Sequence, residues 1–246
     1  YRFVRGEELR GHTFGNLLIT TLSEVEGDIG QATRVLNRLL NLSGAVWPVS
    51  AEPLTLIATK QDGVRVSGES RLREVPGAVR RLELEPSDAQ ALPEVVLAVR
   101  DADLVVLGPG SLFTSVIAPL LVPDVRRAIG SSAAPLVYVS NIMTEVGETD
   151  GMDAFDHARA VHDHLGRWPD LVLVNDRPID EARRASYREE GAEEVAVVPS
   201  AFADQGVALR AAPLLADGRY AQHDSVRLAE ELTRLAMLAK SGEALA

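Results

Sequence analysis

The sequence predicts a three-layer α/β fold, in which helices cover both faces of a parallel sheet and a small β-rich insertion is added. From residue 93 onward, short apolar runs alternate with amphipathic helical segments, which is typical of parallel strands buried on both faces. The chain has 246 residues, of which 46% are hydrophobic and 25% charged, and this is enough for one large α/β domain. We therefore expect a single domain over residues 1–246, with a β-rich lobe at about 45–86.

Two helices are expected before the lobe. Gly11 and Gly15 flank His12 at the start of a hydrophobic helix. A second helix begins at about Asp28 and repeats apolar residues at amphipathic spacing. The glycines around His12 are more typical of a helix N-terminus that faces a ligand than of a surface loop.

The lobe is predicted from a change of periodicity. Short β-type runs separated by turn residues lie at 46–49, 54–58, 64–66 and 79–84. The segment 60–63, which ends in Asp62-Gly63, connects two alternating runs and predicts a β-hairpin.

The rest of the chain alternates between helices and strands. We expect helices near 93–100, 112–121, 153–165, 179–190 and 224–240, and strands at 104–107, 136–139, 171–174 and 195–198. Ligands of parallel α/β sheets bind beyond the carboxyl ends of the strands. The segments that follow the first three of these strands should therefore share one rim.

The turn Gly108-Pro109-Gly110 is the most informative candidate on that rim. It links a buried strand to a helix that Ser111 is placed to cap, so it presents free backbone N–H groups at the positive end of a helix dipole. Thr114 and Ser115 add hydroxyl groups to the first helical turn. An ordinary strand–helix turn is the alternative. The segment is neither a G-x-G-x-x-G motif nor a P-loop, because it lacks the third glycine of one and the lysine of the other.

A polar loop at 140–150 is the second candidate. Its potential ligand-binding residues are Asn141, Thr144, Gly147, Glu148 and Thr149, and Asp156 and His157 follow. Such a loop at the end of a strand is suited to a base, a ribose or a phosphate. A solvated loop with local side-chain caps is the alternative interpretation.

No catalytic residue or metal site is assigned from the sequence. His157 and His164 share a helix face seven residues apart, whereas zinc sites use shorter spacings, and a solvated helix face is expected for His162 and His164. There is no G-x-S-x-G motif, and Ser111 has no recognisable histidine and acid partners. His12 is as well suited to capping or ligand binding as to general base catalysis. The sequence thus favours binding over turnover.

Composition excludes several classes of protein. The net charge is −11 and there is no block of lysine or arginine, which argues against nucleic acid as a partner. A small anion can still bind through local N–H groups. The chain has no cysteine, no apolar run long enough for a membrane span and no signal-peptide pattern, so we expect a cytoplasmic protein.

Three segments together resemble the YvcK/CofD-like family, in its YvcK branch, whose members are known as gluconeogenesis factors. The matching segments are LRGHTFGNLL at 9–18, LGPGSLFTS at 107–115, and VSNIMTEVGET at 139–149 followed by Asp156-His157. Weaker similarity continues between them, so that the resemblance covers the chain up to about residue 200.

The resemblance implies a Rossmann-like fold and a cytoplasmic protein that binds a nucleotide sugar, typically UDP-N-acetylglucosamine or UDP-glucose. It also implies a regulatory role in gluconeogenic growth, cell shape and envelope synthesis, with self-association as a common property. On this basis Gly108, Gly110 and Ser111 are expected to hold a diphosphate, and His12 and Asn16 to hydrogen-bond the ligand. The loop residues Asn141, Thr144, Gly147, Glu148 and Thr149 are expected to line the base or sugar side.

The sister CofD branch provides an enzymatic alternative, the magnesium-dependent transfer of a phospholactyl group to a deazaflavin. Family members normally open with a strand, a Gly-Gly-Gly-Thr-Gly loop and an Asp-Asp-Gly-Gly motif, and neither motif occurs here. The chain starts at Tyr1, so we expect that an N-terminal portion with the phosphate loop and the metal-binding aspartates lies outside it. The transferase alternative is weakened accordingly. A purely structural domain is the third alternative.

Overall fold

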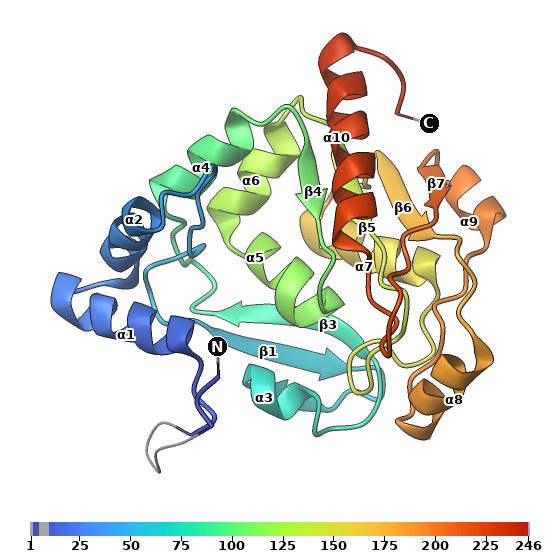
Figure 1. The fold of residues 1–246 in the computed structure, drawn as a ribbon, viewed down its shortest axis with the longest axis horizontal. Helices are drawn as coiled ribbons and strands as arrows, with labels where there is room; N and C mark the ends of the chain where they lie inside the picture. The colour runs from blue at the N-terminus through green and yellow to red at the C-terminus, as the bar shows by residue number, and fades with distance from the viewer. Residues whose placement is uncertain (1, 5–9, 246) are drawn as a thin grey trace.

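The computed structural model describes residues 2–4 and 10–245 (Figure 1). Its centre is a four-stranded parallel sheet in the order β4-β5-β6-β7. The strands are β4 (Val105–Leu107), β5 (Leu136–Val139), β6 (Leu171–Asn175) and β7 (Ala208–Ala212). Leu9, the first residue of the segment at 9–18, lies outside the described residues. The predicted α/β class with a parallel sheet is confirmed.

Helices cover both faces of this sheet, and β5 shows how. Leu136 and Tyr138 face a core built with η1 (Leu112–Ile117), α6 (Pro123–Ser131) and α7 (Ala154–Leu165). Val137 and Val139 face the opposite way, onto α10 (Ser225–Ser241). All four strand residues are fully or almost fully buried, as the continuous apolar run predicts.

The helices at 153–165 and 224–240 are confirmed almost to the residue, because each begins at an aspartate N-cap. Asp153 accepts a hydrogen bond from the backbone N–H of Asp156, and Asp224 accepts from Val226 and Arg227. The remaining helices in this half are α4 (Pro93–Arg100), α5 (Ala118–Leu120), α8 (Glu181–Glu189) and α9 (Pro199–Ala203). Helix α9 was not predicted from the sequence, and neither was α6, which was introduced above.

The predicted strand at 195–198 is wrong. The segment is extended, but Val195 donates to the Ile142 carbonyl, and the Ala196 carbonyl accepts from Ala154 at the start of α7. The fourth strand is β7, whose sequence Ala-Leu-Arg-Ala-Ala contains no β-branched residue. Strand formation there comes from parallel pairing with β6 rather than from local propensity.

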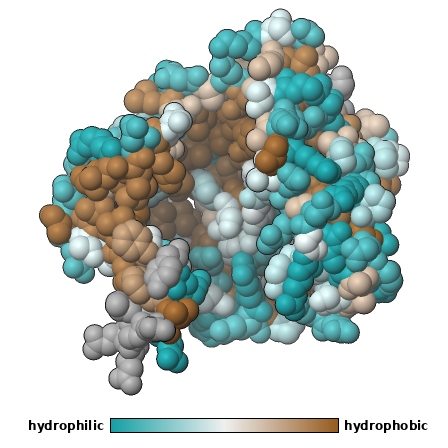
Figure 2. Space-filling view, viewed as in Figure 1, coloured by the Kyte–Doolittle hydropathy of each residue, from teal (hydrophilic) through white to brown (hydrophobic). Residues whose placement is uncertain are grey.

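Two N-terminal helices lie beside this half of the molecule, α1 (Phe14–Glu26) and α2 (Ile29–Leu39). Their N-caps are Thr13 and Asp28, close to the helix starts that the sequence predicts. Figure 2 shows apolar side chains gathered over them and in the hollow beside β4, which is the edge strand of the parallel sheet in the described part of the chain. Helix α2 is tied to α4 by an ion pair of 2.6 Å between Arg34 and Glu94.

The predicted β-rich insertion is a three-stranded antiparallel sheet in the order β2-β1-β3. Its elements are β1 (Thr55–Lys60), β2 (Arg65–Ser67), the short helix α3 (Glu69–Leu72) and β3 (Val79–Glu85). We call these residues, 55–85, the three-stranded lobe. The hairpin at 60–63 is confirmed, and Gly63 supplies its positive φ of 88°. No strand forms at 46–49, where the Asn37 side chain hydrogen-bonds the backbone of Val46.

The lobe and the parallel-sheet half share one hydrophobic core. Leu72, Val79 and Leu82 of the lobe belong to the same buried cluster as Phe113 of η1. The backbone N–H of Leu82 donates to Nε2 of His164 at 2.9 Å, and Nδ1 of this ring lies 2.7 Å from the Ala160 carbonyl. The predicted solvated position of His164 is therefore wrong, because this histidine joins α7 to β3. Burial lowers its pKa.

None of the helices formed by residues 2–4 and 10–245 combines the length and apolar character that a bilayer-spanning helix needs.

Candidate functional site

A cavity of about 510 Å³ opens at the carboxyl ends of β4 and β5. Its lining comes from the turn at 109–111, the loop at 141–145, Tyr187 of α8 and the segment at 221–223. This is the rim at which the sequence places the ligand, and the volume is typical of small-molecule sites. Of the predicted site residues, Pro109, Gly110, Ser111, Asn141 and Thr144 line it.

The glycine turn adopts a conformation that larger residues would disturb. Gly108 has φ of +84°, and a Cβ there would stand 3.0 Å from the Val139 carbonyl. No described residue accepts a hydrogen bond from the backbone N–H of Gly110 or Ser111. The turn therefore leaves two N–H donors at the cavity, as expected for an anion site.

Ser111 occupies the N-cap position, but its hydroxyl makes no capping hydrogen bond. The expected α-helix instead begins with six residues of π-helix, η1, before α5. The Ser111 hydroxyl accepts a hydrogen bond of 3.0 Å from Nη2 of Arg73, and it lowers the pKa of the nearby Glu145 carboxyl. The serine thus connects the turn to charged groups that come from elsewhere in the chain.

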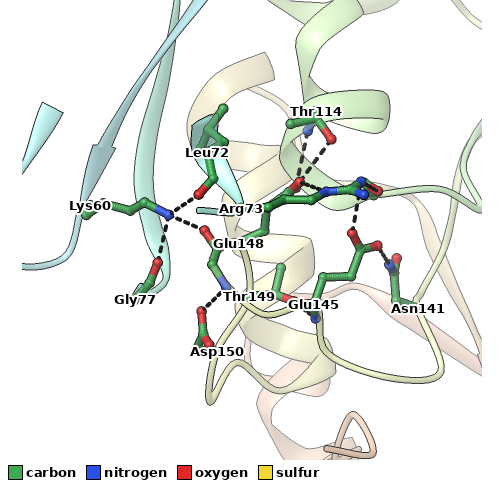
Figure 3. Close-up of polar contacts among 12 residues, drawn as sticks. Lys60, Leu72, Arg73, Gly77, Thr114, Asn141, Glu145, Glu148, Thr149 and Asp150 are labelled. Carbon is green, nitrogen blue, oxygen red and sulfur yellow. Dashed lines mark hydrogen bonds and ion pairs between the residues drawn. The ribbon is translucent and has the colours of Figure 1, made fainter. Parts of the chain in front are cut away.

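Arg73 follows α3 in the three-stranded lobe and reaches across to the loop at 140–150 (Figure 3). Its Nε lies 3.4 Å from the Glu148 carboxylate and its Nη2 lies 3.6 Å from the Glu145 carboxylate. The Arg73 side chain is 57% exposed, while Glu148 is completely buried. No described residue accepts a hydrogen bond from Nη1, so the guanidinium keeps donors for a ligand.

Glu148 joins the loop to η1. Its Oε1 accepts from the Thr114 hydroxyl at 3.0 Å, and its Oε2 accepts from the Thr114 backbone N–H at 3.4 Å. The carboxylate at the start of a helix is favourable for the helix dipole as well. Glu148 and Thr114 were predicted as ligand-binding residues, and the structure places both behind the cavity wall, where they fix the position of the loop.

Gly147 and Thr149 also shape the loop. A Cβ at Gly147, whose φ is +79°, would lie 3.0 Å from the Arg73 Cα and 3.1 Å from the Leu72 carbonyl oxygen. The Thr149 hydroxyl accepts from the backbone N–H of Glu145 at 2.7 Å. Neither residue lines the cavity.

Thr144 lies in the cavity wall with its polar groups already engaged. Its hydroxyl accepts from the Glu193 N–H at 2.9 Å, and its own N–H donates to the Glu193 carbonyl at 2.7 Å. These bonds hold the loop against the segment that precedes Val195.

Other predicted residues lie away from the cavity. Asp156 closes the capping box of α7 with Asp153 and pairs with Arg159. His157 is fully buried, with Nδ1 at 3.3 Å from the Tyr138 hydroxyl, and burial lowers its pKa to about 4.

The two N-terminal candidates, His12 and Asn16, are exposed at the start of α1 and do not line the cavity. Gly108 and Ser115 line a separate cavity of about 330 Å³ between β4 and η1. The structure therefore places the predicted residues in four settings, which are the 510 Å³ cavity, the separate 330 Å³ cavity, the contacts that shape the loop, and positions away from all of these.

Sequence reasoning missed Arg73, Glu145, Tyr187 and His223. Glu145 lies within the predicted loop, but the other three come from the lobe, from α8 and from the segment before α10. The Tyr187 hydroxyl accepts from the Ala221 N–H at 3.1 Å, which brings two of these regions together. No local sequence pattern predicts these contacts, because the two residues that each hydrogen bond joins are at least 34 positions apart in the chain.

The electrostatics of the cavity are mixed. Burial raises the pKa of the Glu145 carboxyl, while the hydrogen bond with Ser111 and the charge of Arg73 oppose that shift. Within residues 2–4 and 10–245, no three His, Asp or Glu side chains converge in a group that could hold a metal ion.

Comparison with known proteins gives a consistent assignment. The family described as "2-phospho-L-lactate transferase CofD" matches residues 1–215. The "Putative gluconeogenesis factor" of Deinococcus radiodurans is 47% identical over 237 residues, which are 96% of this chain and 50% of that protein. The "Gluconeogenesis factor" of Halalkalibacterium halodurans is 41% identical over 198 residues, which are 80% of this chain and 62% of that protein.

The fold also matches a solved structure. A crystal structure of a UPF0052-family protein from Bacillus halodurans superposes with a TM-score of 0.90 at 36% identity, over 95% of this chain and 76% of that one. The chain spans half of the Deinococcus protein and less than two thirds of the Halalkalibacterium protein.

Proposed function

The chain belongs to the CofD family, and on this premise we propose that it is a regulatory protein of the gluconeogenesis-factor type that binds a nucleotide sugar in the 510 Å³ cavity. One observation supports this most directly. The unpaired N–H groups of Gly110 and Ser111 lie beside the Arg73 guanidinium, which bonds to the Ser111 hydroxyl at 3.0 Å. Backbone N–H groups next to an arginine are suited to a diphosphate.

The remaining walls suit the uncharged parts of such a ligand. Ile142 and Met143 provide an apolar surface next to Tyr187, onto which a base or sugar ring can pack. In this arrangement the diphosphate lies at the turn, and the rings extend toward α8 and the segment at 221–223. Glu145 faces the same space, so the binding of an anion depends on how far Arg73 and Ser111 offset its charge.

Binding of the chain to UDP-N-acetylglucosamine, UDP-glucose, GDP and UMP is the direct test. A UDP-sugar at saturating concentration is expected to raise the melting temperature by several degrees. Gly110→Leu is expected to abolish the shift, because the new side chain would fill the turn beside Ser115, whose Cβ is 3.2 Å from the point that a Cβ at residue 110 would occupy.

Gly130→Leu is the matched control, since Gly130 lies exposed on α6 with no atom within 4 Å of its Cβ position. No shift with any nucleotide, either in the unaltered chain or in one extended at its N-terminus, contradicts the proposal and favours a structural domain with a plain turn.

The biological part of the proposal is a cytoplasmic regulator of carbon use, cell shape and envelope synthesis, able to self-associate. It predicts that a bacterium lacking the gene grows poorly on gluconeogenic carbon sources. The same strain carrying the Gly110→Leu protein should grow no better, whereas Gly130→Leu should restore growth. If both variants restore growth, the regulatory role does not depend on ligand binding at the turn, and this part of the proposal is wrong.

The family description favours a second candidate, a CofD-like transferase that uses the same cavity. This candidate requires magnesium and a deazaflavin acceptor. Consumption of that acceptor in the presence of magnesium, followed by mass spectrometry of the product, tests it. If a UDP-sugar raises the melting temperature and no such product forms, the result supports a binding protein over a transferase.

A further inference from the structure

Two buried polar atoms in the cavity wall have no hydrogen-bond partner among the described residues. They are Oδ1 of Asn141 and Nε2 of His223. Four side-chain atoms of the described chain are in this condition, and two of them belong to residues that line one cavity. A buried polar atom without a partner costs free energy, so in a native protein it indicates a missing ligand or water.

Both atoms are hydrogen-bond acceptors. The Asn141 amide nitrogen donates to Glu145 Oε1 at 3.3 Å, which leaves the amide oxygen for another partner. The backbone of Ser140 raises the pKa of the His223 ring, as a carbonyl acceptor beside the ring does, and Nε2 has no partner among the described residues. We therefore assign the hydrogen of the neutral ring to Nδ1 and the lone pair to Nε2. Burial lowers the pKa of His223 and so favours the neutral ring.

The segment that carries His223 is fixed in place before any ligand arrives. His223 forms a β-bridge with Leu215, and the Leu215 N–H donates to Asn175 Oδ1 at 2.8 Å. On the other side, the Ala221 N–H donates to the Tyr187 hydroxyl. A ligand group therefore meets an acceptor whose backbone is already ordered, which lowers the entropic cost of binding.

We infer that Asn141 and His223 form an acceptor pair that binds the hydrogen-bond donors of the uncharged part of the ligand. This inference rests on the proposed function and specifies one end of the same site. The donors are O–H or N–H groups, supplied either by the hydroxyls of the sugar or by the ring N–H of the base. Both atoms are buried, so the assignment requires a small rotation of the amide and of the ring when the ligand binds. An acceptor presented in this way favours a hydrogen-bond donor over a phosphate oxygen.

His223→Asn is the informative variant. Asparagine keeps an N–H that can reach the Ser140 carbonyl, but it has no acceptor at the position of Nε2. Calorimetric titrations of UDP-N-acetylglucosamine, UDP and UMP are compared between the variant and the unaltered chain. Affinity for the UDP-sugar is expected to fall about tenfold, as for a ligand donor left without its partner. His162→Asn, on a helix face where the ring stacks on Trp168, is the control.

The three ligands distinguish the source of the donors. If the sugar hydroxyls supply them, only the UDP-sugar binds more weakly to the variant. If the base supplies them, all three ligands lose affinity equally. Unchanged affinity for all three overturns the acceptor pair, whereas a lack of binding both to the unaltered chain and to one extended at its N-terminus overturns the proposed function together with this inference.

A second measurement does not depend on affinity. In the unaltered chain, the ¹⁵N resonance of His223 Nε2 should move when the UDP-sugar binds, because its lone pair gains a donor. The signal is assigned by its disappearance in His223→Asn, among the five histidines of the chain. A saturated complex in which this resonance stays in place also overturns the acceptor pair.

Discussion

Lys60 and Arg73 both belong to the three-stranded lobe and both contact the loop at 140–150, but their surroundings are opposite. Lys60 is 1% exposed, and its ammonium group donates to the carbonyls of Leu72, Gly77 and Gly147. Three donors therefore meet three acceptors, and none is left for a ligand. Arg73 is 57% exposed and has N–H groups without a described acceptor.

This difference shows how to separate a structural cation from a ligand-binding one. Desolvation lowers the pKa of Lys60, and its three carbonyl partners compensate within the protein. Arg73 has water and two carboxylates around it, so a phosphate can replace part of its hydration. Both cations lie within one lobe, and they differ in exposure and in the hydrogen-bonding capacity that remains for a ligand.

The largest expected effect is on stability. Lys60→Met should lower the free energy of unfolding by about 3 kcal/mol, because three buried carbonyls lose their donor. Urea denaturation measures this. Lys240→Met is a natural control, since these are the two lysines of the chain and Lys240 is 74% exposed. A loss below about 0.5 kcal/mol for Lys60→Met, similar to that expected of the control, would show that the buried amine is not structural.

The contact between lobe and loop can be tested by comparing Gly147 in the loop with Gly151 just after it. Gly147→Ala should cost about 2–3 kcal/mol, because its φ is +79° and the new Cβ would lie 3.0 Å from the Arg73 backbone. Gly151→Ala has a similar φ of +69° but no atom within 4 Å, so about 1 kcal/mol is expected from strain alone. Equal losses of unfolding free energy would mean that the close approach of the lobe is unimportant.

The same lobe marks the limit of what the sequence predicts. The turn at 108–111 and the loop at 140–150 could be placed at one rim, because the ends of parallel strands meet there whatever the side chains do. Arg73 could not, since it contacts Ser111 and Glu148 across 38 and 75 residues of chain. The hydrophobic periodicity of the lobe predicts its strands, but it does not predict which loop of the other half of the molecule the lobe contacts.

The strands themselves show a related limit. The buried run at 136–139 is unmistakable, because burial on both faces requires apolar residues at every position. In contrast, β7 is half-exposed and rich in alanine, so its pattern favours neither strand nor helix. His164 is a similar case, because its contact with the Leu82 backbone depends on the lobe and not on its own helix.

Arg73→Gln tests the ligand-binding cation. The affinity for a UDP-sugar should fall about tenfold, because a charge-assisted bond to phosphate is lost. The unfolding free energy should change by about 1 kcal/mol or less, since the side chain is half-exposed. Arg71→Gln, on α3 and exposed, should leave both quantities unchanged. If Arg73→Gln destabilises the chain as strongly as Lys60→Met, the contrast between the two cations fails.

The smallest effect concerns Glu145, which faces the same cavity as the proposed diphosphate. Burial raises the pKa of its carboxyl, so its negative charge appears at higher pH than for an ordinary glutamate and weakens anion binding above that point. Glu145→Gln removes the charge and should strengthen UDP-sugar binding about threefold at neutral pH. Toward acid pH the unaltered chain should approach the variant, as the carboxyl becomes neutral.

The affinities of the two chains are compared from pH 4 to pH 8. The diphosphate of a UDP-sugar does not titrate in this interval, and both chains keep His223, so the difference between their affinity profiles reports Glu145 alone.

The raised pKa of Glu145 also affects the stability of the folded chain. Because the neutral carboxyl is favoured in the folded chain, Glu145 is most favourable below its ordinary pKa and loses that contribution as the pH rises through its raised pKa. Glu145→Gln should therefore be slightly more stable than the unaltered chain at neutral pH. A constant affinity difference across the pH range would mean that Arg73 and Ser111 keep the carboxylate ionised throughout and that Glu145 is part of the anion site's fixed charge.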